Sequence, residues 1–184
     1  MTADADSSVV EKRHQKRRAA QRSRARLMAV QALYQMDIAQ TDLNEVLTEF
    51  TSTTLDEDDG RQPQDGDMSS DAPFDSSFFE SLARGVVAEQ RDVDPLIQTH
   101  LADGWRLGRL DSTLRAILRS GAYEIVARDD VPVRVVISEY LDIAHAFFDG
   151  DEPKVVNGVL DRLARERRAR EVENVHSGVA DSAT

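Results

Sequence analysis

The sequence predicts an all-α bundle of about seven helices joined by short connections. Apolar residues recur three and four positions apart along most of the chain, which is the period of an amphipathic helix. The composition is 40% hydrophobic and 31% charged but only 5% aromatic, a balance that suits helices rather than sheets. The best strand candidate is VPVRVVI, but Pro132 at its start and the helical spacing that follows favour a helix there too.

Two helices are predicted in the N-terminal part. Residues 1–20 are polar and are predicted to form a disordered tail that ends in basic residues. Helical periodicity then runs from near Arg22 to about Ala39. Asp42 opens a second helix, with Glu45 three residues later as in a capping box. The apolar stripes of the two helices contain Ala25, Ala29, Val30, Ala32, Leu33, Tyr34, Met36, Leu43, Val46, Leu47 and Phe50.

Residues 51–73 interrupt the pattern. They read TSTTLDEDDGRQPQDGDMSSDAP and contain acids, Gly, Pro and Ser but almost no large apolar residue. Such a segment buries too little apolar surface to offset the entropy lost on ordering. We therefore expect a disordered acidic insert between two helices.

The next helices begin at capping residues. Asp75 precedes an apolar stripe that includes Phe78, Phe79 and Leu82. Asp94 followed by Pro95 predicts a new helix or a kink, because proline is favoured in the first turn of a helix. Two glycines then flank a short connector that contains Trp105 and Leu107, and we expect Trp105 to lie in the core.

Three helices complete the predicted bundle. Asp111 opens the most regular one, which ends at the turn over residues 129–132. The following helix starts at Val133 and ends before Gly150, and Pro153 starts the last. The helical domain is thus predicted over residues 21–166, followed by a polar tail over residues 167–184. No cysteine is present, which excludes disulfides, thiolate zinc sites and a cysteine nucleophile.

Positive charge is concentrated in one block. Residues 11–26 read EKRHQKRRAAQRSRAR, with eight Lys or Arg and one acid, in a chain of net charge −11. The block leads directly into an apolar helix, as expected of a local phosphate-binding surface. A solvated helix face is the alternative, but cations near a helix N-terminus oppose the helix dipole and do not favour the helix. The residues alone leave open both RNA binding and a purely protein-binding bundle.

Catalytic and metal-binding motifs are missing from the sequence. The four histidines form no HExxH pair, and no GxSxG, P-loop or GxGxxG segment occurs. We therefore predict no catalytic residue, no metal site and no cofactor. No apolar run is long enough to span a bilayer, and the N-terminus lacks the order of a signal peptide. These features predict a cytoplasmic protein that does not bind membranes.

Five sequence blocks occur in an order that is similar to a known family. They read RSRARLMAVQALYQMD, FFESLARGV, LRAILRSGAYEIV, VPVRVVISEYLDIAHAF and KVVNGVLDRLA. Over residues 21–165, apart from the insert, the chain resembles the NusB family of transcription antitermination factors. The resemblance implies two small helical bundles packed side by side, with no catalysis. It also implies binding of boxA-type RNA in nascent ribosomal RNA leaders, jointly with a small-subunit ribosomal protein acting as NusE, to promote read-through by RNA polymerase.

The resemblance also assigns residues. The implied RNA contacts are Arg18, Arg22, Arg24, Arg26, Tyr34, Asp151, Lys154 and Asn157. The implied partner-binding face lies on the helix that carries Leu114, Leu118 and Glu124. Structural roles compete with two of these assignments, since Tyr34 could be a boundary core residue and Asn157 could bond a neighbouring turn. The alternative function is a helical protein-interaction module without direct RNA binding.

Overall fold

The computed structural model describes residues 3–55, 74–169 and 171–172, and within them it is all-α, as predicted. No strand occurs in these ranges. The elements are α1 (Ala3–Ala39), α2 (Leu43–Leu55), α3 (Ser76–His100), the 3₁₀ turn η1 (Leu107–Arg109), α4 (Ser112–Ala127), α5 (Val133–Phe147) and α6 (Glu152–Arg167).

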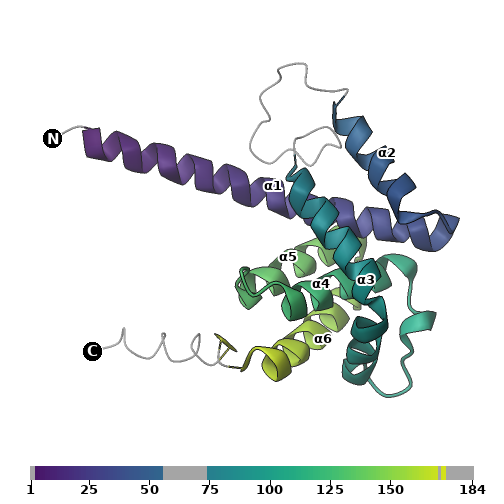
Figure 1. The fold of residues 1–184 in the computed structure, drawn as a ribbon. Coiled ribbons are helices and arrows are strands. Elements are labelled where there is room, and N and C mark those ends of the chain that lie inside the picture. Colours follow the sequence, from purple (N-terminus) through teal and green to yellow (C-terminus); the bar gives the residue numbers. More distant parts are fainter. Residues whose placement is uncertain (1–2, 56–73, 170, 173–184) are drawn as a thin grey trace, which may run out of the picture.

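Helix α4 lies at the centre of the molecule (Figure 1). It packs against α1 and α3 on one side and against α5 and α6 on the other. Its buried residues include Ile117, Leu118, Ala122 and Ile125, which belong to one continuous core shared by both groups of helices. Since α4 has neighbours on both sides, most of its side chains are removed from solvent.

Helix α1 is longer than the sequence predicts. Residues 3–20, expected to be disordered, continue the helix back to Ala3, and Figure 1 shows this part projecting away from the bundle. Ala, Lys, Arg and Gln are strong helix formers, and no Gly or Pro interrupts the segment. The helix therefore continues without an apolar face to bury, which is why apolar periodicity did not reveal it.

Helix α2 extends to Leu55, so residues 51–55 of the predicted insert are helical. Thr51 lies partly buried, and its hydroxyl donates to the Leu47 carbonyl oxygen at 2.8 Å. The remainder of the predicted insert, residues 56–73, lies outside the described residues. The predicted C-terminal tail lies outside them from residue 173 onward.

Helix α3 continues through Pro95 to His100, where the sequence allowed a new helix to begin. This accounts for six α-helices in the described residues rather than about seven. An interior proline costs a helix about 3 kcal/mol. Val93 and Ile97 on either side are buried in the core, and burial of such side chains contributes about 1.5–3 kcal/mol each. Packing is therefore sufficient to keep the helix continuous.

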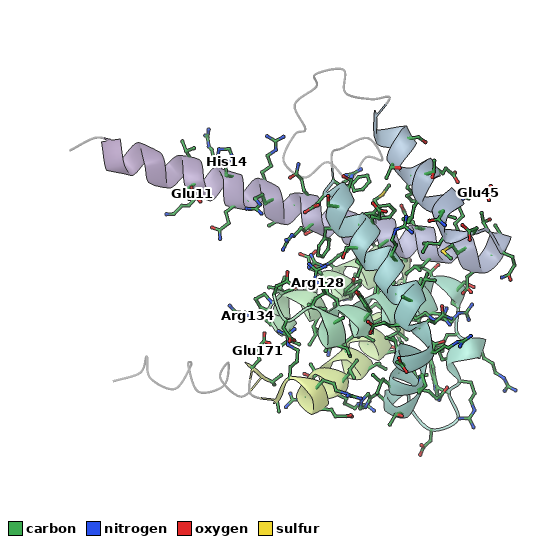
Figure 2. The ribbon with its side chains drawn as sticks, in the orientation of Figure 1. Glu11, His14, Glu45, Arg128, Arg134 and Glu171 are labelled. Atoms are coloured by element: carbon green, nitrogen blue, oxygen red, sulfur yellow. The ribbon has the colours of Figure 1, made fainter. Side chains whose placement is uncertain are left out.

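The C-terminal segment after α6 folds back onto the turn between α4 and α5. Arg168 donates to the Val131 carbonyl oxygen at 2.9 Å and pairs with Glu171. The Glu171 carboxylate accepts the Val133 N–H at 2.6 Å, at the start of α5 (Figure 2). A residue distant in sequence thus caps a helix whose own N-cap, Pro132, has no side-chain acceptor.

The predicted helix caps provide a first prediction. Asp111 accepts the N–H groups of Thr113 at 2.8 Å and Leu114 at 3.2 Å. We expect Asp111→Ala to lower the free energy of unfolding by about 1 kcal/mol, because the start of α4 loses its only side-chain cap. Urea denaturation measures this loss. Asp111→Asn, which keeps the acceptor oxygen, is the control, and an equal loss for both variants would contradict the capping role.

Candidate nucleic-acid interface

The projecting part of α1 carries exposed basic side chains. Residues 11–20 are all exposed and include Lys12, Arg13, Arg17 and Arg18. Figure 2 shows His14 on this part of the helix, away from the packed elements. Arg18 is therefore accessible to a ligand, as the predicted RNA-binding role requires.

Arg22 lies where α1 meets the start of α3. Its side chain is partly exposed, and its Nε lies 3.7 Å from the Asp75 carboxylate. Its guanidinium carbon lies 5.0 Å from the centroid of the Phe78 ring. The Asp75 N–H also donates to the Gln21 carbonyl oxygen at 3.2 Å. These contacts hold Arg22 near the surface without burying it. Arg24, two residues further on, is also partly exposed.

Three guanidiniums surround the Phe78 ring. Those of Arg22, Arg26 and Arg128 each lie 5.0 Å from its centroid. Arg128 also bonds the Asp130 carboxylate through Nε at 2.8 Å. This hydrogen bond raises the pKa of Arg128 and holds the pKa of Asp130 below its ordinary value. The aromatic face and the carboxylates thus offset the repulsion between the cations.

Arg26 does not belong to the accessible surface, which corrects its predicted RNA contact. It is 2% exposed and forms a bidentate pair with Glu124, at 3.0 Å from Nε and 2.5 Å from Nη2. Burial by itself lowers the pKa of Arg26, but the hydrogen bond and charge of Glu124 outweigh it, so the pKa is raised. The guanidinium lies in the interior because Arg26 is on the face of α1 that packs against α4.

Glu124 is likewise internal, which corrects its predicted partner contact. It is fully buried and also accepts the Tyr140 hydroxyl at 3.0 Å. Burial and the neighbouring Glu124 charge raise the pKa of Tyr140 well above its ordinary value. Leu114 and Leu118, the other predicted partner contacts, are core residues. All three lie on α4, whose central place in the bundle leaves them no route to a partner.

Tyr34 is presented to solvent from the second half of α1. Its side chain is 41% exposed, whereas the preceding Leu33 is buried. Part of the ring is therefore available to a ligand.

The predicted contacts at the start of α6 are exposed as well. Asp151, Lys154 and Asn157 all lie at the surface, and the Lys154 ammonium donates to the Asp151 carboxylate at 2.7 Å. This bond lowers the pKa of Asp151 and raises that of Lys154. Asn157 makes no side-chain bond to a neighbouring turn within the part of the chain that the structure describes.

The order of the helices brings Tyr34 and the start of α6 to one end of the molecule. Helix α1 runs antiparallel to α4, since Arg26 pairs with Glu124 and Asp37 pairs with Arg115. Helices α4, α5 and α6 pack against one another through short connections, so α6 begins at the same end as α4. The accessible candidates therefore extend from Arg18 along α1 toward the end that carries Tyr34 and Lys154.

Trp105 is a surface residue that the sequence analysis placed in the core. It is 43% exposed, and Arg106 and Arg109 beside it are exposed too. Its place between two glycines in a connector, followed by two arginines, was the signal for exposure, since connectors lie at the surface.

The described residues contain neither a metal-binding cluster nor a helix that could cross a membrane. No cluster of three or more His, Asp or Glu side chains among them could hold a metal ion. In the same ranges, no helix has the length and apolarity needed to cross a membrane.

Comparison with known proteins assigns the family. The profile of the NusB family matches residues 23–165. The chain belongs to the NusB family. Transcription antitermination protein NusB of Rhizobium rhizogenes is 55% identical over 148 residues, which cover 80% of this chain and 88% of that protein. Its counterpart from Rhodopseudomonas palustris is 49% identical over 156 residues, covering 84% and 85%.

Solved structures share the NusB fold. NusB of T. maritima superposes with a TM-score of 0.64 at 28% identity, covering 83% of this chain and 96% of that chain. A structure of the antitermination factors NusB and NusE with double-stranded RNA has a TM-score of 0.62 at 23% identity, covering 80% and 98%, and supports the fold. Tyr34, Arg26 and the start of α6 lie inside the NusB match, whereas Arg18 and Arg22 precede it.

Proposed function

We propose that this chain is a transcription antitermination factor that binds single-stranded boxA-type RNA in nascent ribosomal RNA leaders. It acts together with the small-subunit ribosomal protein that serves as NusE, in the antitermination complex of RNA polymerase. The proposal is carried by the NusB match over residues 23–165, which runs through the accessible helix that bears Arg24 and Tyr34. The role is that of a non-catalytic adaptor, and its place of action is the cytoplasm, where transcription occurs.

The arginines supply the electrostatic part of RNA binding. Arg18 is exposed, and Arg22 and Arg24 are partly exposed, although the Arg24 Nε is buried. Arg18 and Arg22 are four residues apart and share one face of α1, whereas Arg24 points to another, so phosphates would be reached from more than one face of the helix. Each phosphate neutralised on a single strand contributes about −0.7 to the slope of log K against log salt. Three contacts therefore predict a slope of about −2 from this helix.

Tyr34 and the start of α6 supply the remaining contacts. RNA is read mainly through unstacked bases that stack on aromatic rings, and Tyr34 offers such a ring. Lys154 can exchange the exposed Asp151 carboxylate for a phosphate, and the Asn157 amide can bond a base edge or the backbone. The strand would thus follow α1 and end at the start of α6.

The protein partner would raise affinity by linkage, since it adds a second RNA-contacting surface next to this one. Because Leu114, Leu118 and Glu124 are internal, the partner must contact residues other than these three. We test the proposal by titrating boxA RNA with this chain alone and with the ribosomal protein. No binding in either titration, together with binding of the ribosomal protein, would favour the protein-interaction module instead.

Removing the Tyr34 ring should weaken RNA binding. We expect Tyr34→Ala to reduce affinity for boxA RNA by about 1–3 kcal/mol, the usual contribution of one base stacked on an aromatic ring. Filter binding or fluorescence anisotropy measures the loss. Tyr34→Phe keeps the stacking surface and should retain most of the affinity. Unchanged affinity of the alanine variant would show that no base stacks there.

A further inference from the structure

The backbone around Trp105 is held in place by hydrogen bonds. Its N–H donates to the Ala102 carbonyl oxygen at 3.0 Å, and its carbonyl oxygen accepts the Gln98 Nε2 at 2.9 Å. The Gln98 Oε1 in turn accepts the Leu107 N–H at 3.0 Å. The Gln98 side chain of α3 thus bonds two backbone groups of the connector, the Trp105 carbonyl oxygen and the Leu107 N–H. An exposed indole on a fixed backbone binds a flat ligand with little further loss of conformational entropy.

Two arginines accompany the indole on the 3₁₀ turn. Arg106 is the N-cap of η1 and Arg109 is its last residue, and the Arg109 N–H donates to the Arg106 carbonyl oxygen at 2.9 Å, so the turn brings the backbone of the two residues together. Both are exposed, whereas Leu107 is buried and Leu110 packs against the core. Among the residues that the structure describes, no carboxylate forms an ion pair with Arg106 or Arg109.

The carboxylates nearest in sequence do not neutralise this turn. Asp111 is occupied at the cap of α4, where it accepts two backbone N–H groups, and Asp103 is exposed. The two guanidiniums are thus charged groups without a carboxylate partner in a chain of net charge −11. Exposed aromatic and cationic side chains in one short segment are the combination that binds single-stranded nucleic acid with little sequence preference.

The connector lies next to the end of the proposed RNA path. The Arg115 guanidinium donates to the Leu110 carbonyl oxygen at 3.1 Å and to the Asp37 carboxylate at 2.9 Å. One side chain therefore joins the connector to α1, within a helical turn of Tyr34. Figure 1 shows η1 on the side of the bundle opposite to the projecting start of α1. A strand that runs along α1 from Arg18 toward Tyr34 is directed to this end.

We propose that Trp105, Arg106 and Arg109 form an accessory surface for single-stranded RNA that flanks the boxA segment. One base stacks on the indole, and the two guanidiniums pair with phosphates on either side of it. The proposal rests on the RNA-binding function given above, and it adds contacts outside boxA with no preference for base sequence. It predicts that the length of the RNA, as well as its boxA sequence, determines affinity.

Fluorescence provides a direct test, because Trp105 is the only tryptophan in the chain. The full chain is titrated with boxA RNA alone and with boxA RNA extended at either end by about ten uridines, the order of one single-strand site. We expect an extension at one end to quench the emission and to tighten binding about tenfold. The short RNA should leave the emission nearly unchanged.

Variants separate the indole from the charges. Trp105→Ala should abolish the gain from the extension and leave binding of boxA RNA alone unchanged, while Trp105→Phe should keep most of the gain. Arg106→Gln with Arg109→Gln should reduce the salt slope for the extended RNA by about 1.4. Arg165→Gln, which removes an exposed charge on α6, is the matched control and should keep the gain. Circular dichroism verifies that each variant is folded.

Three other results would contradict either the proposed function or the accessory surface. If no RNA binds with or without the ribosomal protein, the proposed function fails. If boxA RNA binds but neither extension adds affinity or quenching, the accessory surface is wrong and the proposed function stands. Emission that responds to the ribosomal protein and not to extended RNA would assign Trp105 to a protein contact and likewise overturn the accessory surface.

Discussion

Arg26→Ala is expected to lower the free energy of unfolding by about 3–5 kcal/mol, because it leaves a buried carboxylate without its cation. Glu124 would lose both bonds from the guanidinium, at 3.0 and 2.5 Å, and keep only the Tyr140 hydroxyl. A domain of this size is stable by only about 5–15 kcal/mol. The variant should therefore unfold at a much lower temperature and urea concentration, which calorimetry and urea denaturation measure.

Matched variants separate the ion pair from the volume it fills. Glu124→Ala should be about as destabilising as Arg26→Ala, since it leaves the buried guanidinium with only the longer Glu139 contact at 3.4 Å. Arg26→Met combined with Glu124→Leu should recover much of the loss, because apolar residues of similar size can replace a buried pair. Normal stability of Arg26→Ala with lost RNA affinity would place Arg26 in the RNA interface after all.

Replacing Arg18, Arg22 and Arg24 together with glutamine is expected to nearly abolish binding of boxA RNA while the helices remain intact. The salt slope should decrease by about 2, since each phosphate contact on a single strand contributes about 0.7. Arg18 is exposed, and Arg22 gives up only a partly exposed contact to Asp75 and its interaction with the Phe78 ring. Filter binding at several salt concentrations measures the loss, and circular dichroism measures helicity.

Arg84 and Arg165 offer a control for this experiment. Both are exposed and bond a carboxylate four residues away on their own helix, so their replacement by glutamine removes charge without touching α1. RNA affinity should remain nearly unchanged in this control. An equal loss for both sets would mean that overall charge, rather than the position of the arginines on α1, determines binding.

Much of the secondary structure could be read from the sequence, because helices are specified by local features. Asp75 and Asp111 cap α3 and α4 as predicted, and the apolar residues at helical spacing, apart from Tyr34, lie in the core or pack against it. The start of α1 was missed because a polar helix has no apolar period. The sequence allowed a new helix at Pro95, but α3 continues through it. The rule for helix starts considers only local sequence, whereas the burial of Val93 and Ile97 in the core keeps the helix continuous.

The candidate site was predicted less completely. The sequence located the basic block and Tyr34, but it treated neighbouring arginines as one surface. On a helix, successive residues point in different directions, so Arg24 remains near the surface while Arg26 faces α4. Trp105 shows the converse error, since its size and apolar ring suggested the core and the connector holds it outside.

By itself, the sequence determined that this chain is helical, where most of its helices begin, and that its positive charge is gathered at one end of the first folded helix. These are properties of short segments, set by periodicity, capping and composition. Only the tertiary structure decided which charged residues are available to a ligand. That distinction depends on contacts between elements. Glu124, 98 residues from Arg26 in sequence, holds the Arg26 guanidinium in the core, whereas Gln98 of α3 bonds the connector backbone with Trp105 exposed to solvent.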